Sequence, residues 1–361
     1  MISESPAKLP RSQARQTPGH PRSLLPSLRE IEFVCPVCRG QLEILRDREG
    51  YRCQKCDRAY LSHAGIPDFR VFRDPFLSFE EDHERTEIIL AELDHRNLES
   101  LLEYYWTFSD ITPVALRPKF IRSALLGEGK AKRILRTFES GAFKKPVTPR
   151  RVLEIGSGTG NFLALAAKQY EQVIGIDIAM RWLHVSRRRF MDQKLPVPPL
   201  VCCCAEYLPF ADDSFDLVVS SATLEFVKDQ EQVLAECART LKQDGLVFLN
   251  TANRYAVSKD PYAYLFGVGL LPRTWQVPYV RWRREAPYEV RTLSLGELNK
   301  LASKYFRTRE FLLPNVVPEA LRHFSAPTRM QMRLYQTVRR LWPFSLLLKW
   351  VGPGWDILLR K

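Results

Sequence analysis

The 361-residue sequence has no run of about 18–20 apolar residues, which is the length that a membrane-spanning helix needs. Residues 1–30 are rich in Pro, Ser and Arg and lack an apolar core, which argues against a secretory signal and predicts a disordered tail. Acidic residues are also in deficit, with 41 Asp and Glu against 54 Lys and Arg and a net charge of +13. The excess lies in residues 254–361, where nineteen Lys and Arg face seven Asp and Glu. This segment suits nucleic acid, anionic lipid or a diphosphate-linked substrate, or it is a solvated basic surface.

The eight cysteines fall into two groups of four. Two CxxC pairs, Cys35 with Cys38 and Cys53 with Cys56, are separated by fourteen residues. This spacing is typical of a tetrahedral Zn²⁺ site, and a site closed by four sulfurs is structural. We therefore expect a zinc ribbon over residues 31–72. The remaining thiols, three consecutive ones at 202–204 and Cys237, are expected to be buried and inert, which favours a reducing, cytoplasmic location.

A glycine-rich turn at 156–160 lies between two expected strands, residues 152–155 and 173–176. A helix is expected to follow the turn, and the second strand ends in Asp177, 21 residues after Gly156. Glycines allow a sharp turn and a close approach to a ligand, while an acid at that distance suits ribose hydroxyls. Glu154, just before the turn, would repel a pyrophosphate and attract a cationic ligand. The pattern indicates a cofactor that contains a nucleoside.

On these motifs the chain resembles the class I S-adenosylmethionine-dependent methyltransferases, of the type 11 kind, over roughly residues 148–256. The likeness includes Cys204 to Asp216, Leu217 to Phe226 and Leu241 to Gly245. It implies an α/β, Rossmann-like fold with a seven-stranded sheet in the order 3-2-1-4-5-7-6 and helices on both faces.

The same resemblance implies which residues hold S-adenosylmethionine. Glu154 would hold the methionine end, Asp177 the ribose, and Ala205 with Glu206 the adenine edge. Cys204 stands where the family usually has an acid for the adenine amine, so adenine recognition is expected to depend on Glu206 or on backbone groups. The expected set is Glu154, Gly156, Ser157, Gly158, Thr159, Gly160, Asp177, Ile178, Cys204, Ala205, Glu206 and Ser221.

The segment Tyr60 to Phe69 makes the expected ribbon resemble small zinc-ribbon activators of tRNA methyltransferases. Residues 73–145 are expected to form a helical linker or cap, and residues 146–361 the methyltransferase domain. Within that domain we expect an aromatic and basic insertion at 255–291, which would cover the substrate. A second, basic helical insertion at 316–352 contains Trp and Leu residues that suit either a membrane interface or packing against the sheet.

Many small-molecule methyltransferases have Glu-His-Val where this chain has Glu225-Phe226-Val227, so a histidine base is absent there. Glu225 and His323 are the remaining candidates for a catalytic base, and His184 is expected on an exposed helix. The fourth expected strand also lacks the motifs typical of adenine amino and pyrimidine carbon-5 methylation. We expect O- or C-methylation of a small or lipid-linked acceptor, as in methyltransferases resembling those of polysaccharide or polyprenyl metabolism. The alternatives are an RNA methyltransferase and a non-catalytic scaffold.

Overall fold

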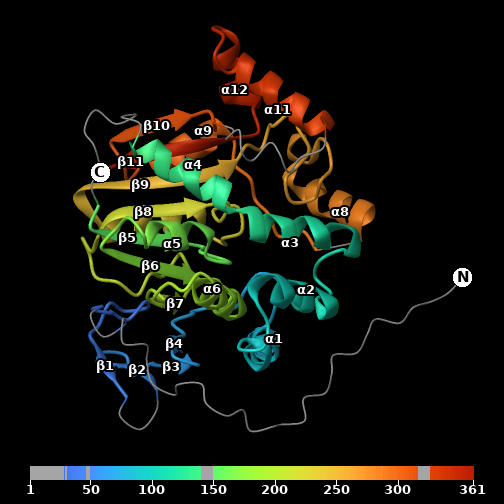
Figure 1. The fold of residues 1–361 in the computed structure, drawn as a ribbon. Helices are drawn as coiled ribbons and strands as arrows, with labels where there is room; N and C mark the ends of the chain where they lie inside the picture. Colours follow the sequence, from blue (N-terminus) through green and yellow to red (C-terminus); the bar gives the residue numbers. More distant parts are fainter. Residues whose placement is uncertain (1–27, 29–30, 46–48, 140–148, 286, 316–325) are drawn as a thin grey trace, which may run out of the picture.

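The computed structural model describes residues 28, 31–45, 49–139, 149–285, 287–315 and 326–361. Its centre is a seven-stranded mixed sheet in the order β10-β11-β9-β8-β5-β6-β7 (Figure 1). The expected seven-stranded α/β fold is therefore confirmed. Except for Leu28, the expected tail at 1–30 lies outside the described residues.

In this sheet β11 runs antiparallel to both of its neighbours, β9 and β10, and the other six strands point in the same direction. Val152 and Leu153, on opposite faces of the central strand, are both fully buried, as expected for a sheet covered on both sides. The carboxyl ends of the parallel strands lie together at one end of the strands, and open α/β sheets bind ligands at that end. The strands are β5 (Arg151–Ile155), β6 (Gln172–Asp177), β7 (Leu200–Cys202), β8 (Phe215–Ser221), β9 (Leu241–Ala252), β10 (Thr308–Leu312) and β11 (Gly354–Arg360).

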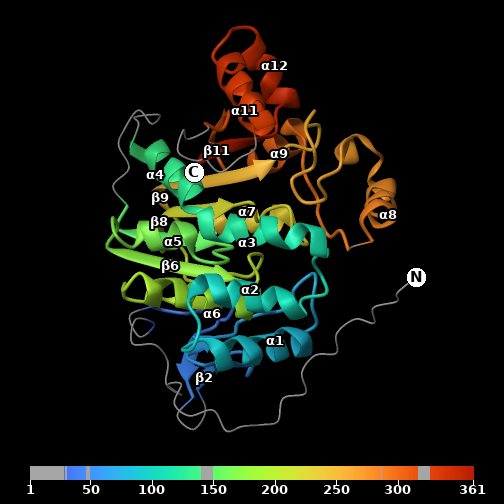
Figure 2. The same ribbon diagram turned by 45° about the vertical axis from the view of Figure 1, so that its right-hand side comes forward.

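Helices cover both faces of the sheet (Figures 1 and 2). One face packs against α4 (Glu128–Glu139), α5 (Asn161–Ala166) and α6 (Met180–Asp192), whose apolar side chains share a core with Val152. The other face packs against α7 (Gln230–Thr240) and α9 (Leu295–Ala302). Within the described ranges, no helix combines the length and apolar character required to cross a membrane.

The cysteine-rich segment forms a small antiparallel sheet of four strands, β1 (Leu42–Ile44), β2 (Gly50–Cys53), β3 (Ala59–His63) and β4 (Ile66–Pro67). This small sheet lies against β7, the edge strand of the large sheet (Figure 1). The Phe69 N–H donates to the Cys202 carbonyl at 2.7 Å, and the centres of the Phe33 and Phe210 rings are 5.8 Å apart. The contact covers an edge that would otherwise expose unpaired backbone groups.

A helical layer connects the small sheet to β5 and packs beside α6. It contains α1 (Phe79–Glu92), α2 (Leu98–Phe108), the 3-10 turn η2 (Val114–Leu116) and α3 (Arg117–Leu126). Ser78 and Glu81 form a capping box at the start of α1, which satisfies backbone donors there. Because α1 and α2 cover α6, His184 is fully buried, so its expected exposure was wrong.

The first insertion contains the 3-10 turn η3 (Val268–Leu270) and α8 (Arg273–Arg284), which pack around their own apolar cluster. The second contains α11 (Ala326–Val338) and α12 (Phe344–Val351) in its described part. In Figure 2 the first insertion, with α8, lies beyond the arrowhead of β9, and the second, with α11 and α12, lies above β11. His323 and the rest of 316–325 lie outside the described residues.

Candidate functional site

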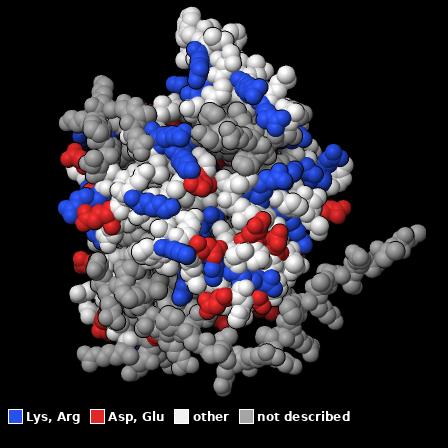
Figure 3. Space-filling model, in the orientation of Figure 1, with Lys and Arg blue, Asp and Glu red and all other residues white. Residues whose placement is uncertain are grey.

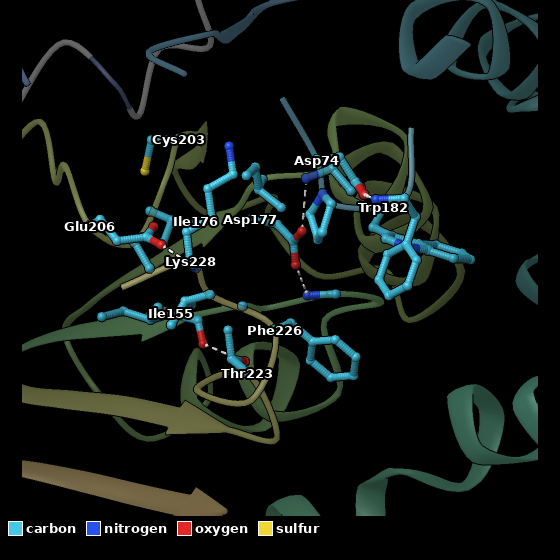
Figure 4. A pocket seen from close by; sticks show the side chains of 18 of the residues that line it. Asp74, Ile155, Ile176, Asp177, Trp182, Cys203, Glu206, Thr223, Phe226 and Lys228 are labelled. Carbon is cyan, nitrogen blue, oxygen red and sulfur yellow. Dashed lines mark hydrogen bonds between the residues drawn. The ribbon is translucent and has the colours of Figure 1, made fainter. Parts of the chain in front are cut away.

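A cavity of about 290 Å³, here called the first cavity, lies at the carboxyl ends of β5, β6 and β8 (Figure 4). Six of the residues expected to contact a cofactor line it: Gly156, Gly158, Asp177, Ile178, Ala205 and Glu206. In the view of Figure 4, Glu206 lies at one end, Trp182 at the other and Asp177 between them. The structure thus brings together residues that are up to 50 positions apart in the sequence.

The glycine turn is built for close approach. Gly156 has φ 72°, in the left-handed region, and a Cβ at this position would lie 2.1 Å from the Thr223 hydroxyl oxygen. Gly158 has φ 49°, and a Cβ there would meet no atom within 4 Å. The first glycine is therefore required by the packing of the turn against the loop after β8, and the second leaves open space beside the cavity.

Asp177 and Glu206 are held by backbone donors. The two oxygens of Asp177 accept hydrogen bonds from the Gly158 and Ala179 N–H groups, each at 2.9 Å. Burial raises the pKa of Asp177 from 3.8 to about 6. Glu206 accepts a hydrogen bond from the Lys228 N–H at 2.7 Å, and burial raises its pKa as well. Both carboxyl groups are fixed in orientation and are easier to protonate than exposed acids.

Glu154 and Ser157 lie in β5 and the turn, behind the lining of the first cavity. Both are buried, and neither Oε2 of Glu154 nor the Ser157 hydroxyl has a hydrogen-bond partner among the described residues. Burial raises the pKa of Glu154 well above its ordinary value. A buried acceptor without a partner costs free energy, so these atoms suit a ligand that donates hydrogen bonds or carries positive charge.

Two expected residues are replaced in the lining by their neighbours. Cys203 lines the first cavity, while the Cys204 thiol donates to the Phe72 carbonyl at 3.5 Å. Ala222 and Thr223 line it in place of Ser221, whose hydroxyl donates to Asn250 at 3.5 Å. Cys203, Ala222 and Thr223 come directly after the ends of β7 and β8, where the chain leaves the sheet. Thr159 and Gly160 complete the turn outside the lining, and the Thr159 carbonyl accepts from Arg189 at 2.6 Å.

Residues 72–76, which follow the small sheet, cover part of the first cavity. Asp74 pairs at 3.0 Å with Arg181 of α6, and Arg181 also pairs with Asp82 of α1. These three charged side chains are at most 3% exposed. The Lys228 ammonium lies 3.8 Å from the centre of the Phe72 ring. Sequence reasoning missed this set, since only the packing of the small sheet against β7 brings the segment to the cavity.

A second cavity, of about 280 Å³, adjoins the first. The two share Phe76, Arg181, Trp182 and Phe226 in their linings. The second cavity is bounded by α2 and residues 111–120 on one side and by the first insertion on the other. Its other aromatic lining residues are Tyr105, Trp106, Phe120, Tyr262 and Tyr288. A lining of this kind suits an apolar or aromatic ligand.

Glu225 does not line the second cavity. It is 1% exposed, and its Oε1 accepts hydrogen bonds from the Thr251 hydroxyl at 2.8 Å and the Ala252 N–H at 2.6 Å. Tyr262, which does line the cavity, lies against Glu225, and burial together with that carboxylate raises its pKa well above the usual value. Tyr262 is therefore the residue of this lining that lies against Glu225.

The four thiols of Cys35, Cys38, Cys53 and Cys56 converge, with all sulfurs within 4.8 Å of one another. The pair Cys35–Cys56 is separated by 3.7 Å and the pair Cys38–Cys53 by 3.4 Å. A tetrahedral Zn²⁺ with Zn–S bonds of about 2.3 Å requires sulfurs about 3.8 Å apart. The donor set and spacing fit such an ion. By contrast, Cys202, Cys203 and Cys237 are fully buried, and burial raises the pKa of each thiol.

Comparison with known proteins identifies a methyltransferase domain in the part of the chain that contains the glycine turn. A family profile described as "Methyltransferase domain" matches residues 153–249. The ubiquinone biosynthesis O-methyltransferase of Thiobacillus denitrificans is 30% identical over 177 residues, which cover 45% of this chain and 74% of that protein. Its counterpart in Pseudomonas aeruginosa is 31% identical over 171 residues, covering 43% and 72%.

A malonyl-acyl-carrier-protein O-methyltransferase from Laribacter hongkongensis is 39% identical over 115 residues. The match covers 28% of this chain and 37% of that protein, so the chain spans only part of the length of this relative.

Proposed function

The chain belongs to the S-adenosylmethionine-dependent methyltransferases and is an enzyme of that family; from this premise we propose that it methylates a small or lipid-linked acceptor held in the second cavity. The observation that carries the proposal is that the two cavities adjoin through Phe76, Trp182 and Phe226. A cofactor in the first cavity and an acceptor in the second would meet at these rings. The reaction is O- or C-methylation, and polysaccharide or polyprenyl metabolism is the proposed setting.

We propose that the first cavity holds S-adenosylmethionine through three acids. Glu154 would neutralise the ammonium of the methionine end, Asp177 would accept from the ribose hydroxyls, and Glu206 would face the adenine edge. Support comes from the unpartnered Oε2 of Glu154 and from the fixed orientation of Asp177 in the lining. The cofactor supplies a methyl group on a positively charged sulfur. The protein's main task is then to align the acceptor.

We propose that Tyr262 contacts the acceptor and that Glu225 is a positioning residue. Glu225 is anchored by Thr251 and Ala252 and lies against Tyr262, so it can orient the phenol. When the acceptor hydroxyl releases its proton to the Tyr262 oxygen, the phenol proton can pass to Glu225. The aromatic lining would bind the apolar part of the acceptor and exclude water from the point of transfer. His323, the other expected candidate, lies outside the described residues and takes no part in this proposal.

The test combines binding with transfer. Calorimetry on the zinc-loaded protein measures S-adenosylmethionine affinity, and labelled-methyl transfer into fractionated cell extract shows where label enters. Label in lipid or small molecules supports the proposal, and label confined to RNA overturns it in favour of the RNA methyltransferase. The test variant is Tyr262→Phe, which keeps the ring and removes the hydroxyl. Its matched control is Tyr104→Phe, since Tyr104 lies on α2 outside both linings.

We also propose that Cys35, Cys38, Cys53 and Cys56 hold a structural Zn²⁺, as their converging sulfurs support. The ion would stabilise the small sheet against β7 and thereby the segment 72–76 over the first cavity. We further propose that the small sheet is related to the zinc-ribbon activators of tRNA methyltransferases. Metal analysis by mass spectrometry should give one zinc per chain at this site, and a metal-free folded protein would contradict it.

A further inference from the structure

The hairpin of α11 and α12, residues 326–351, exposes an unusual amount of apolar surface. Six of its large apolar side chains are more than half exposed: Met330, Leu334, Trp342, Phe344, Leu347 and Trp350. Trp342 is 80% exposed, and α12 has no buried residue. Single exposed apolar residues are ordinary, but a cluster of this size in one element marks an interaction surface.

The same 26 residues are strongly basic. They contain Arg329, Arg333, Arg339, Arg340 and Lys349 and no Asp or Glu. Figure 3 shows blue side chains among white ones over this hairpin, at the top of the molecule. Tryptophan, leucine and phenylalanine together with basic residues are the composition of helices that lie in a membrane interface. Each basic residue near an anionic membrane adds attraction that falls with salt.

The hairpin is anchored at its base through backbone carbonyls, which leaves its apolar side chains outward. The Asn253 amide donates to the Trp350 carbonyl at 2.7 Å, and the Val257 N–H donates to the Val351 carbonyl at 3.0 Å. The Trp355 indole donates to the Lys349 carbonyl at 2.8 Å. Asn253 lies just before the first insertion and Val257 lies within it, and later residues of this insertion line the second cavity. The hairpin is therefore fixed relative to the proposed acceptor site.

We propose that the α11–α12 hairpin docks the enzyme on an anionic lipid surface, with its tryptophans in the interface and its basic residues at the headgroups. The inference rests on the proposed function for its purpose, since a lipid-linked acceptor lies at such a surface. A second copy of this chain is a poorer occupant, because two faces with five positive charges each would repel one another. RNA would leave the apolar side chains unused.

The test is flotation of the full chain with vesicles of phosphatidylcholine alone or with about 30 mol% phosphatidylglycerol. We expect binding to the anionic vesicles that weakens with salt, and little binding to the neutral ones. Trp342→Ser with Trp350→Ser should lower binding about tenfold or more. The matched control is Trp275→Ser with Trp282→Ser, which removes two tryptophans on α8 that are 67% and 73% exposed. The control should bind as the wild type does.

Three outcomes overturn the proposal. These are absence of binding to anionic vesicles, equal loss in both double variants, and a wild-type dimer in light scattering that the hairpin variant abolishes. Thermal unfolding of each variant shows whether it is folded, and a hairpin variant with Arg339→Gln and Arg340→Gln provides a second, milder change. Calorimetry with S-adenosylmethionine on the same preparations reports the proposed function separately, because the hairpin residues do not line the first cavity.

Discussion

The Asp177→Asn variant tests the first cavity most directly. In the wild type both carboxylate oxygens accept backbone N–H groups at 2.9 Å, and the side chain lines the cavity. An asparagine has one acceptor oxygen, so its amide nitrogen must face either the Gly158 or the Ala179 N–H. Loss of one charge-assisted hydrogen bond and of the acceptor for a ribose hydroxyl is worth about 1.5–3 kcal/mol. We expect the dissociation constant for S-adenosylmethionine to rise about 10- to 100-fold.

The pH dependence of binding provides an independent check on the same residue. With a pKa of about 6, Asp177 is protonated below that pH and cannot accept from both backbone donors and a ligand. Wild-type affinity should therefore fall by up to about tenfold per pH unit below 6, and the variant should lack this component. Stability has the opposite sign. Because folding raises this pKa from 3.8, the contribution of Asp177 is present below 3.8 and lost as pH rises through 6.

Calorimetry from about pH 5 to pH 8 measures the affinity, and thermal unfolding measures the stability difference between wild type and variant. The matched control is Asp212→Asn, since the Asp212 side chain is 72% exposed and pairs with Arg239 at 2.8 Å. Affinity in Asp177→Asn equal to that of the wild type at pH 8 would refute the assigned role. An equal loss in the control would show that the effect is not local.

Three further predictions concern other parts of the molecule. Cys53→Ser should release the zinc and weaken S-adenosylmethionine binding, because residues 72–76 then lose their support; unchanged affinity in the metal-free protein would contradict the coupling. Arg181→Met should lower the free energy of unfolding by about 3–5 kcal/mol in urea titration, since it leaves buried Asp74 without its cation, whereas Arg150→Met, 79% exposed, should change it little. Tyr262→Phe should slow methyl transfer about tenfold or more without changing cofactor affinity. A variant with altered cofactor affinity and an unchanged transfer rate would contradict the proposed contact of Tyr262 with the acceptor.

Local patterns in the sequence determined the parts of this protein that depend on neighbouring residues. The strand before Gly156, the glycines with positive φ and the acid at the end of the next strand belong to one βαβ unit. Their geometry depends on backbone sterics and short spacing, so the chain alone predicts it. The four cysteines were equally predictable, because each CxxC turn brings two sulfurs together and the pairing of β1 with β2 brings the two turns together.

Tertiary structure alone decided which residues complete the site. Residues 72–76 reach the first cavity because the small sheet packs on β7, and nothing in their own sequence indicates this. Cys203 lines the cavity and Cys204 does not, because the Cys204 thiol faces the Phe72 carbonyl, and His184 is buried because α1 and α2 cover α6. The second cavity exists only where the helical layer meets the first insertion, more than 140 residues later in the chain. Such contacts depend on the packing of distant surfaces, which periodicity and spacing do not encode.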